Sequence, residues 1–198
     1  MAGIGSRDGA RPIIEANECY ENEMAGIGAR DGAEPIIRSN TCYRNAMAGI
    51  GSRLGAKPLI VDNECYENKL AGIGAREGAM PIIKSNRCFK NDLAGIGARE
   101  RAFCLIEGNE CTQNKAAGIG ARSGAVVMLL HNKCLDNNLV AIGLRLGSTA
   151  YIMDNELERT GGMPPLIAVR EGSSALIVGN SLKGGGVAGI LVDGTARI

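Results

Sequence analysis

The sequence predicts an all-β solenoid, a single domain over residues 1–198 in which short strands stack in about eight or nine coils of ~23 residues. The first observation is a fixed period, because a cysteine recurs every 23 residues. These cysteines are Cys19, Cys42, Cys65, Cys88, Cys111 and Cys134. The second is the unit around each cysteine, which reads MAGIGSRDGARPIIEANECYENE at its first occurrence. A unit of this length buries its apolar face only against its neighbours, so the units must stack.

The units are regular over residues 1–161 and degenerate over residues 162–198. Regular units start at Met1, Met24, Met47, Leu70, Leu93, Ala116 and Leu139. An insertion around Gly161 to Pro165 precedes an eighth unit, and a ninth ends at Ile198. We therefore expect one solenoid domain whose C-terminal coils are less uniform.

Short strands rather than helices are expected within each unit. Residues 2–7 alternate apolar positions with glycine and arginine, and residues 12–14 add a second β-prone run. Glycine, proline and asparagine recur at intervals too short for an amphipathic helix. A leucine-rich repeat of similar length is the alternative, but it requires a regular leucine framework that this unit lacks.

Stacking in register places equivalent residues about 4.8 Å apart, so each repeat position becomes a column. The isoleucine columns that start at Ile4 and Ile14 are nearly unbroken, and we expect both to point inward. The asparagine column that starts at Asn17 is expected at a turn, where its amide can bond along the stack and asparagine tolerates left-handed φ.

The string GIGARDGAEPIIRSNTCYRN, residues 26–45, resembles the repeat of the carbohydrate-binding and sugar-hydrolase (CASH) or pectate-lyase-like type. That repeat has a G-I strand, a P-x-I strand and an N-x-I-x-x-N segment, in which cysteine here replaces the last isoleucine. The resemblance implies a right-handed single-stranded parallel β-helix. The same coil occurs in polysaccharide lyases, in periplasmic copper-enzyme maturation proteins and in substrate-receptor regions of F-box proteins, so it implies a fold rather than an activity.

One arginine column is the leading candidate for binding. It contains Arg7, Arg30, Arg53, Arg76, Arg99, Arg122 and Arg145, and Arg170 continues it. Alternation places these side chains outside, and acidic residues such as Asp8, Asp31 and Glu77 follow directly and can compensate the charge. Guanidinium groups in a row also suit a linear polyanion such as a uronate or sulfated glycan.

Two further columns are candidates for contacts with partners. Ile13, Ile36, Leu59, Ile82, Leu105, Met128 and Tyr151 form an apolar column expected to face outward, as an interface or self-association surface. Tyr20, Tyr43, Tyr66 and Phe89 form an aromatic column that can stack on sugars or can cap the corner of the coil.

The cysteine column is expected to be a core ladder of free thiols. A metal site needs two to four ligands that converge on one point, and a parallel row without histidine partners does not provide this. Cys104, which stands where Pro12, Pro35, Pro58 and Pro81 lie in other units, is expected to be a packing substitution. No metal or cofactor is therefore expected.

Composition excludes several classes of function. The chain has 22 basic and 21 acidic residues, which gives no global attraction for nucleic acid or an anionic membrane. No run approaches the ~20 apolar residues of a membrane span. The sequence does not indicate a compartment.

We expect a non-enzymatic structural or binding module that mediates assembly, because uniform coils give catalytic groups no place to converge. Its partner would be a second copy, placed laterally or head to tail, or another protein. The alternative is a protein that binds or cleaves an acidic polysaccharide through the arginine column.

Overall fold

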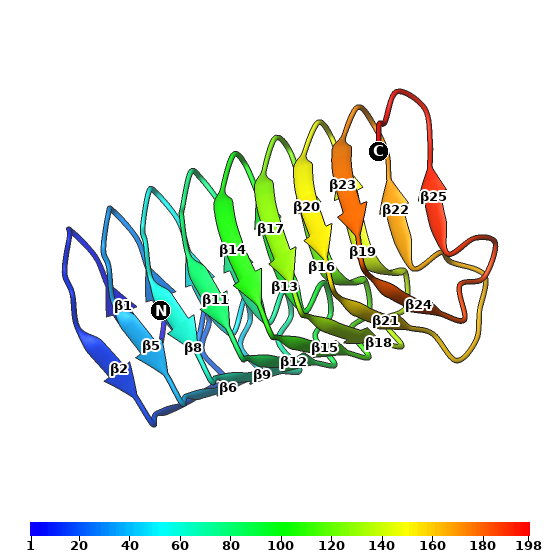
Figure 1. Cartoon of the computed structure of the whole chain (residues 1–198). Helices are drawn as coiled ribbons and strands as arrows, with labels where there is room; N and C mark the ends of the chain where they lie inside the picture. Colours follow the sequence, from blue (N-terminus) through cyan, green and yellow to red (C-terminus); the bar gives the residue numbers. More distant parts are fainter.

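The computed structural model describes residues 1–198 and contains 25 strands and no helix. Each of the first eight coils contributes one strand to each of three parallel sheets, which we call sheets A, B and C, and the ninth adds one strand to sheet A. Figure 1 shows the coils following one another along one axis, from the N-terminal coil to the C-terminal coil. The predicted all-β parallel solenoid is confirmed.

The strands are short and follow the repeat. Sheet A contains β1 (Ile4–Ser6), β4 (Ile27–Ala29), β7 (Ile50–Ser52), β10 (Ile73–Ala75), β13 (Ile96–Arg99), β16 (Ala117–Arg122), β19 (Val140–Arg145), β22 (Ile167–Val169) and β25 (Ile190–Val192). Sheet B contains β2 (Ile13–Glu15), β5 (Ile36–Arg38), β8 (Leu59–Val61), β11 (Ile82–Lys84), β14 (Phe103–Glu107), β17 (Val126–Leu130), β20 (Thr149–Met153) and β23 (Ser174–Val178). Sheet C contains β3 (Glu18–Tyr20), β6 (Thr41–Tyr43), β9 (Glu64–Tyr66), β12 (Arg87–Phe89), β15 (Glu110–Thr112), β18 (Lys133–Leu135), β21 (Glu156–Glu158) and β24 (Ser181–Lys183).

The register places equivalent residues of neighbouring coils side by side. Ile73 pairs with Ile96 in sheet A, and Cys88 pairs with Cys111 in sheet C. The step between paired residues lengthens from 23 to 25 at the pair Ile142 and Ile167, because the insertion at Gly161 to Pro165 adds to that coil.

The core is built from inward columns of all three sheets. Both isoleucine columns point inward as predicted, with Ile73 and Ile83 fully buried. Six cysteines complete the core from sheet C, and Cys104 joins it from sheet B. All seven are buried free thiols, as predicted. Their parallel side chains fill the space that isoleucine fills elsewhere, since a buried thiol behaves as a small apolar group.

The asparagine column that starts at Asn17 lies at the turn from sheet B to sheet C and bonds along the stack. The Asn63 amide nitrogen donates to the Asn86 side-chain oxygen at 2.9 Å and to the Ile37 carbonyl at 2.9 Å. The left-handed residue is not the asparagine itself, which corrects the expectation, but the residue before it. Asp62 (φ 54°) and Ser85 (φ 54°) are examples. The left-handed residue reverses the chain just before the asparagine. The asparagine amide can then point inward and donate to carbonyls at the ends of the strands, such as those of Ile37 and Val61.

A second asparagine column lies at the turn from sheet C to sheet A. It is the last residue of the N-x-I-x-x-N segment, but its bonding along the stack was not predicted from the sequence. It contains Asn22, Asn45, Asn68, Asn91, Asn114 and Asn137. The Asn91 amide nitrogen donates to the Asn114 side-chain oxygen and to the Cys65 carbonyl, both at 3.0 Å. The column ends where the buried guanidinium of Arg159 donates to the Asn137 carbonyl.

Candidate functional site

A long groove runs over the outer face of sheet A and crosses seven coils. Its volume is about 810 Å³, and its lining extends from Met1 to Arg145. Its floor is the outward residue that follows the inward isoleucine of each sheet A strand, and this residue is a glycine in every coil from the first to the seventh. The floor residues are Gly5, Gly28, Gly51, Gly74, Gly97, Gly120 and Gly143.

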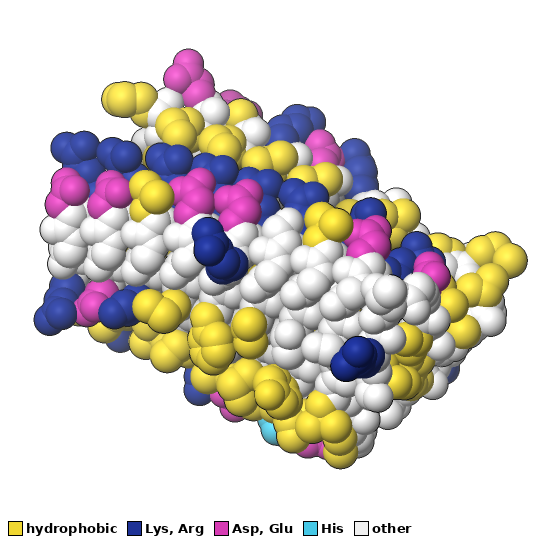
Figure 2. Space-filling view, turned by 90° about the horizontal axis from the view of Figure 1, so that it is seen from above, with side chains coloured by type: hydrophobic (Ala, Val, Ile, Leu, Met, Phe, Trp, Pro, Cys, Tyr) yellow, Lys and Arg dark blue, Asp and Glu magenta, His cyan; other side chains and the backbone are white.

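Two different walls border this floor. The first is the arginine column, two residues after each glycine and therefore on the same side of the strand. The second is an aliphatic column in the turn that enters sheet A, where Met47, Leu70 and Leu93 stand beside a row of alanines. Figure 2 shows the basic row flanked by acidic side chains on one side and apolar ones on the other.

Two glycine columns occur in the motif AGIG, and the structure separates their roles. A Cβ atom added at Gly72 would lie 2.8 Å from the Gly95 carbonyl oxygen and 2.9 Å from the Asn91 amide nitrogen, so packing requires glycine there. A Cβ atom added at Gly74 would meet nothing closer than the Ala48 Cβ at 3.7 Å, an ordinary contact.

The floor glycines also do not have the left-handed φ that favours glycine. Neither sterics nor backbone conformation therefore requires glycine at the floor from Gly5 to Gly120. Gly143 is the exception, since a Cβ there would lie 2.9 Å from Val140 Cγ2.

Acidic neighbours compensate part of the arginine column, as predicted. In the pairs Arg7–Asp8, Arg30–Asp31, Arg76–Glu77 and Arg99–Glu100 the arginine Nε lies 3.3 to 3.4 Å from the carboxylate. Glu171, expected to compensate Arg170, instead accepts from Arg145 of the preceding coil at 2.8 Å, and Arg170 lies 3.7 Å from Asp193. Leu146 occupies the acidic position of the seventh coil, so Arg145 has no adjacent carboxylate and pairs with the one in the next coil.

Two members of the column have no carboxylate within 4.0 Å. Leu54 follows Arg53 and Ser123 follows Arg122, so the acidic position is vacant in these coils. No ion pair and no hydrogen bond engages either guanidinium group. In the four adjacent pairs, the contact through Nε leaves the terminal nitrogens directed elsewhere.

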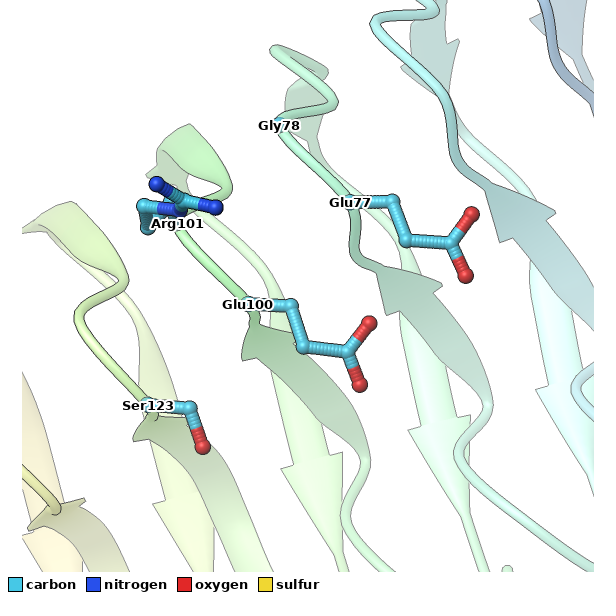
Figure 3. A pocket seen from close by; sticks show the side chains of 5 residues that line it. All are labelled: Glu77, Gly78, Glu100, Arg101 and Ser123. Atoms are coloured by element: carbon cyan, nitrogen blue, oxygen red, sulfur yellow. The ribbon is translucent and has the colours of Figure 1, made fainter.

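A smaller hollow of about 680 Å³ lies on the turns between sheets A and B. Figure 3 shows its lining, where the carboxylates of Glu77 and Glu100 project side by side and Arg101 points away from them. Both carboxylates are already paired with Arg76 and Arg99. No group of three or more His, Cys, Asp or Glu side chains in the chain could hold a metal ion.

The aromatic column forms a continuous stack at the edge of sheet C. Ring centroids of Tyr43 and Tyr66 lie 4.9 Å apart with an interplanar angle of 1°, and Tyr20 and Phe89 continue the stack. The neighbouring rings cover each other's faces, and the Arg87 guanidinium lies over the Phe89 ring, 5.6 Å from its centroid. A hydrogen bond to Glu18, together with slight desolvation, raises the pKa of Tyr43 to about 12.

The apolar column of sheet B faces outward as expected. Ile13 is 62% exposed, and Ile36, Ile82 and Tyr151 are also exposed, while Leu59, Leu105 and Met128 are half-buried. This face and the groove lie on different sheets, so a ligand on one leaves the other free.

The cysteines are separated from both surfaces. Cys104 is fully buried, and burial raises the pKa of its thiol to about 12 from an ordinary value of 9.0. At neutral pH almost none of this thiol is ionised to the thiolate, which is the form that attacks electrophiles and binds metals. Cys104 is therefore a poor nucleophile and a poor metal ligand.

Sequence reasoning identified the arginine wall and missed the other two parts of the groove. Met24 and Arg30 are six residues apart, but they stand on opposite walls because the chain enters and leaves sheet A between them. One signal in the sequence could have revealed the groove. A glycine recurs at an outward position of the first seven strands in sheet A, although folding does not require glycine in the first six of them.

Comparison with known families identifies the fold. Residues 1–102 and 90–198 both match the model of the right-handed β-helix region, so this chain belongs to that family. No curated protein matches the chain. None of its segments forms a helix long and apolar enough to cross a membrane.

Solved structures similar to this chain include two kinds of epimerase. The periplasmic alginate epimerase AlgG superposes with a TM-score of 0.83 at 19% identity, over 91% of this chain and 47% of that one. The A-module of the mannuronan C-5 epimerase AlgE4 of Azotobacter vinelandii superposes with a TM-score of 0.82 at 17% identity, over 94% of this chain and 57% of that one. This chain thus spans about half the length of both proteins, and the similarity shows the fold alone.

Proposed function

We propose that this protein is a binding module that holds a linear acidic polysaccharide in the groove over sheet A and does not catalyse a reaction on it. The observation that carries the proposal is the bare glycine floor between an arginine wall and an aliphatic wall. A polymer can lie along this floor across successive coils.

The glycine floor has a cost that folding does not explain. A glycine inside a strand destabilises it by roughly 0.5–1 kcal/mol relative to alanine, because it loses more backbone entropy. Gly28, Gly51, Gly74 and Gly97 each have room for a Cβ atom. Glycine in a strand otherwise marks a place where a ligand or another backbone approaches closely. An extended ligand in van der Waals contact with the strand backbones accounts for the column.

The arginine wall favours an anionic ligand. Guanidinium groups recur about every 4.8 Å along the axis and can bind carboxylates with two parallel hydrogen bonds. Arg53 and Arg122 have no carboxylate partner, so they keep full affinity for an external anion. Because their acidic neighbours are missing, these two positions are expected to bind anionic groups most strongly.

The aliphatic wall distinguishes a sugar polymer from a nucleic acid. Met47, Leu70 and Leu93 offer an apolar surface against which the C–H faces of sugar rings can pack. No aromatic side chain lines the groove, whereas proteins that bind single-stranded nucleic acid stack its bases on aromatic rings. Fold neighbours that act on alginate and mannuronan, both acidic polysaccharides, agree with this choice of ligand class.

The residues that line the groove support binding without catalysis. Arginine and serine are its only polar side chains, and it contains no histidine, carboxylate, tyrosine, lysine or cysteine. Arginine stays protonated at any physiological pH, so it cannot act as a general base. Proton abstraction or acid catalysis on a bound sugar would therefore lack a group to perform it.

The test is calorimetric titration of the protein with alginate oligomers, with neutral dextran oligomers of matched length as the control. We expect alginate to bind at low ionic strength and to weaken progressively with added salt, since exposed charges are screened. We expect no binding of dextran. Absence of alginate binding at low salt, or equal binding of the two polymers, would refute the proposal.

A further inference from the structure

The outer face of sheet B consists of three columns, with the apolar column that starts at Ile13 in the centre. The column before it contains Arg11, Glu34, Lys57, Met80, Phe103, Val126, Thr149 and Ser174. The column after it contains Glu15, Arg38, Val61, Lys84, Glu107, Leu130, Met153 and Val178. We call these the leading column and the trailing column.

The leading and trailing columns carry opposite charges in the first two coils. In the first coil Arg11 stands on the leading side and Glu15 on the trailing side. In the second coil the signs are reversed, with Glu34 leading and Arg38 trailing. From the third coil onward no coil carries charge on both sides, and in the sixth Val126 and Leu130 are both apolar.

We propose that this face binds a second copy of the chain, related by a two-fold axis that lies in the interface and runs parallel to the solenoid axis. Such an axis places each coil of one copy at the same height as the equivalent coil of the other copy. The strands of the two copies then run in opposite directions across the interface. The leading column of one copy therefore faces the trailing column of the other, and the central column faces itself. Arg11 then meets Glu15 of the second copy, and Glu34 meets its Arg38. Within one copy these side chains already form the ion pairs Arg11–Glu34 and Arg38–Glu15, each at 2.9 Å, so the dimer would join these pairs into one charge network across the interface.

The other face-to-face arrangement has less of this complementarity. A two-fold axis along the strands would place the first coil opposite the eighth and each column opposite itself. Only Lys84 and Glu107 would then bring opposite charges together across the interface, whereas the parallel axis does so in both of the first two coils. Opposite charges across an interface favour one register over another, which favours the parallel arrangement.

The dimensions of the face suit a dimer. Eight strands at a spacing of ~4.8 Å and about five residues at ~3.3 Å give a plan of about 34 Å by 16 Å, or roughly 540 Å². Each partner of a standard interface buries about 800 Å² of accessible surface, which is of the same order for a face with projecting side chains. The exposed apolar column would supply the buried centre, and the charged coils would set the register.

Sedimentation velocity across a concentration series tests the dimer. We expect the wild type to form dimers, and Ile82→Lys to raise the dissociation constant about a hundredfold or more, because the two lysines would face each other across the axis. Leu146→Lys is the matched control, since Leu146 is also exposed but lies on a turn outside this face. Thermal unfolding of the variants checks that they fold equally. A monomeric wild type, or an Ile82→Lys variant that dimerises as tightly as the control, would refute the proposal.

Crosslinking tests the direction of the axis. In the proposed dimer, two Ile13→Cys thiols face each other across sheets about 10 Å apart, so a bismaleimide of that length should join them. In the arrangement with the axis along the strands, they would lie about seven coils, or ~34 Å, apart along the solenoid axis. The wild-type protein, whose thiols are all buried, is the control and should not crosslink. A dimer of the Ile13→Cys protein that does not crosslink would overturn the parallel arrangement.

Discussion

The outer faces of sheets A and B differ in their central columns, although both columns occupy outward positions on strands of the same coils. On sheet A the central column is glycine from the first coil to the seventh, and on sheet B it is a large apolar residue in all eight coils. Several other exposed positions of these coils vary, as Glu15, Arg38 and Val61 illustrate, although the arginine column is as uniform as these two. Since common ancestry of the repeats would preserve all positions alike, the two uniform columns reflect demands made on the two surfaces.

The nature of these demands follows from the residue chosen. A column without side chains lets an extended molecule approach the backbone, whereas a column of large aliphatic side chains offers area to bury. Under the two proposals, sheet A binds a ligand and sheet B pairs with a second copy. The buried side chains on the inner faces of both sheets stabilise the fold.

The largest expected effect contrasts two adjacent residues of β10. Ile73→Ala should lower the free energy of unfolding by about 3–4 kcal/mol, because Ile73 is fully buried in the core. Gly74→Ala should leave it unchanged or raise it by up to about 1 kcal/mol, because its Cβ meets only an ordinary contact. Urea unfolding of the two variants measures both. A loss of more than about 1 kcal/mol in Gly74→Ala would make the floor glycines structural and remove the main support for the groove.

The second effect contrasts equal charge changes on the two faces. Replacing Arg53, Arg76 and Arg99 by alanine should weaken alginate binding about a hundredfold, since each charge-assisted hydrogen bond contributes roughly 1 kcal/mol or more. Replacing Arg38, Lys57 and Lys84 of sheet B by alanine removes the same charge and should change binding less than about threefold. Titration of both variants at one salt concentration decides the question, and equal losses would mean that only net charge matters.

A smaller effect is expected when Arg53 is given a carboxylate partner. Leu54→Glu would reproduce the pair formed by Arg76 and Glu77, whose Nε to carboxylate distance is 3.4 Å. Competition for this guanidinium should weaken alginate binding about two- to fivefold, in line with the value of an exposed ion pair. Val61→Glu, on sheet B, adds the same charge away from the groove. An identical change in both variants would show that Arg53 has no particular role.

The smallest effect concerns the interior that separates the two faces. Because burial raises the pKa of Cys104 to about 12, its thiolate is nearly absent at pH 8, and reaction with a thiol reagent requires opening of the coil. We expect the folded protein to react negligibly with such a reagent at pH 8 and all seven thiols to react after denaturation. Rapid labelling of the native protein would indicate that the coils open readily.

The sequence predicts the fold well because stacking imposes a period on every inward position. The isoleucine, cysteine and first asparagine columns are each needed by the neighbouring coil, so they recur and can be recognised. The groove is harder to predict, since Gly72 and Gly74 look equivalent in AGIG and only the surrounding atoms show that one is required by packing. Similarly, nothing in the order of residues shows that Met24 and Arg30 stand on opposite walls.

The most direct test of the two-face account fills the groove floor without touching either wall. Gly51, Gly74 and Gly97 are replaced together by threonine, and the affinity for alginate oligomers is measured by calorimetry beside the thermal midpoint and the dimer dissociation constant. The account predicts unchanged stability and dimerisation, with alginate binding weakened at least about tenfold because side chains now occupy the floor. Full alginate affinity in this variant would contradict it.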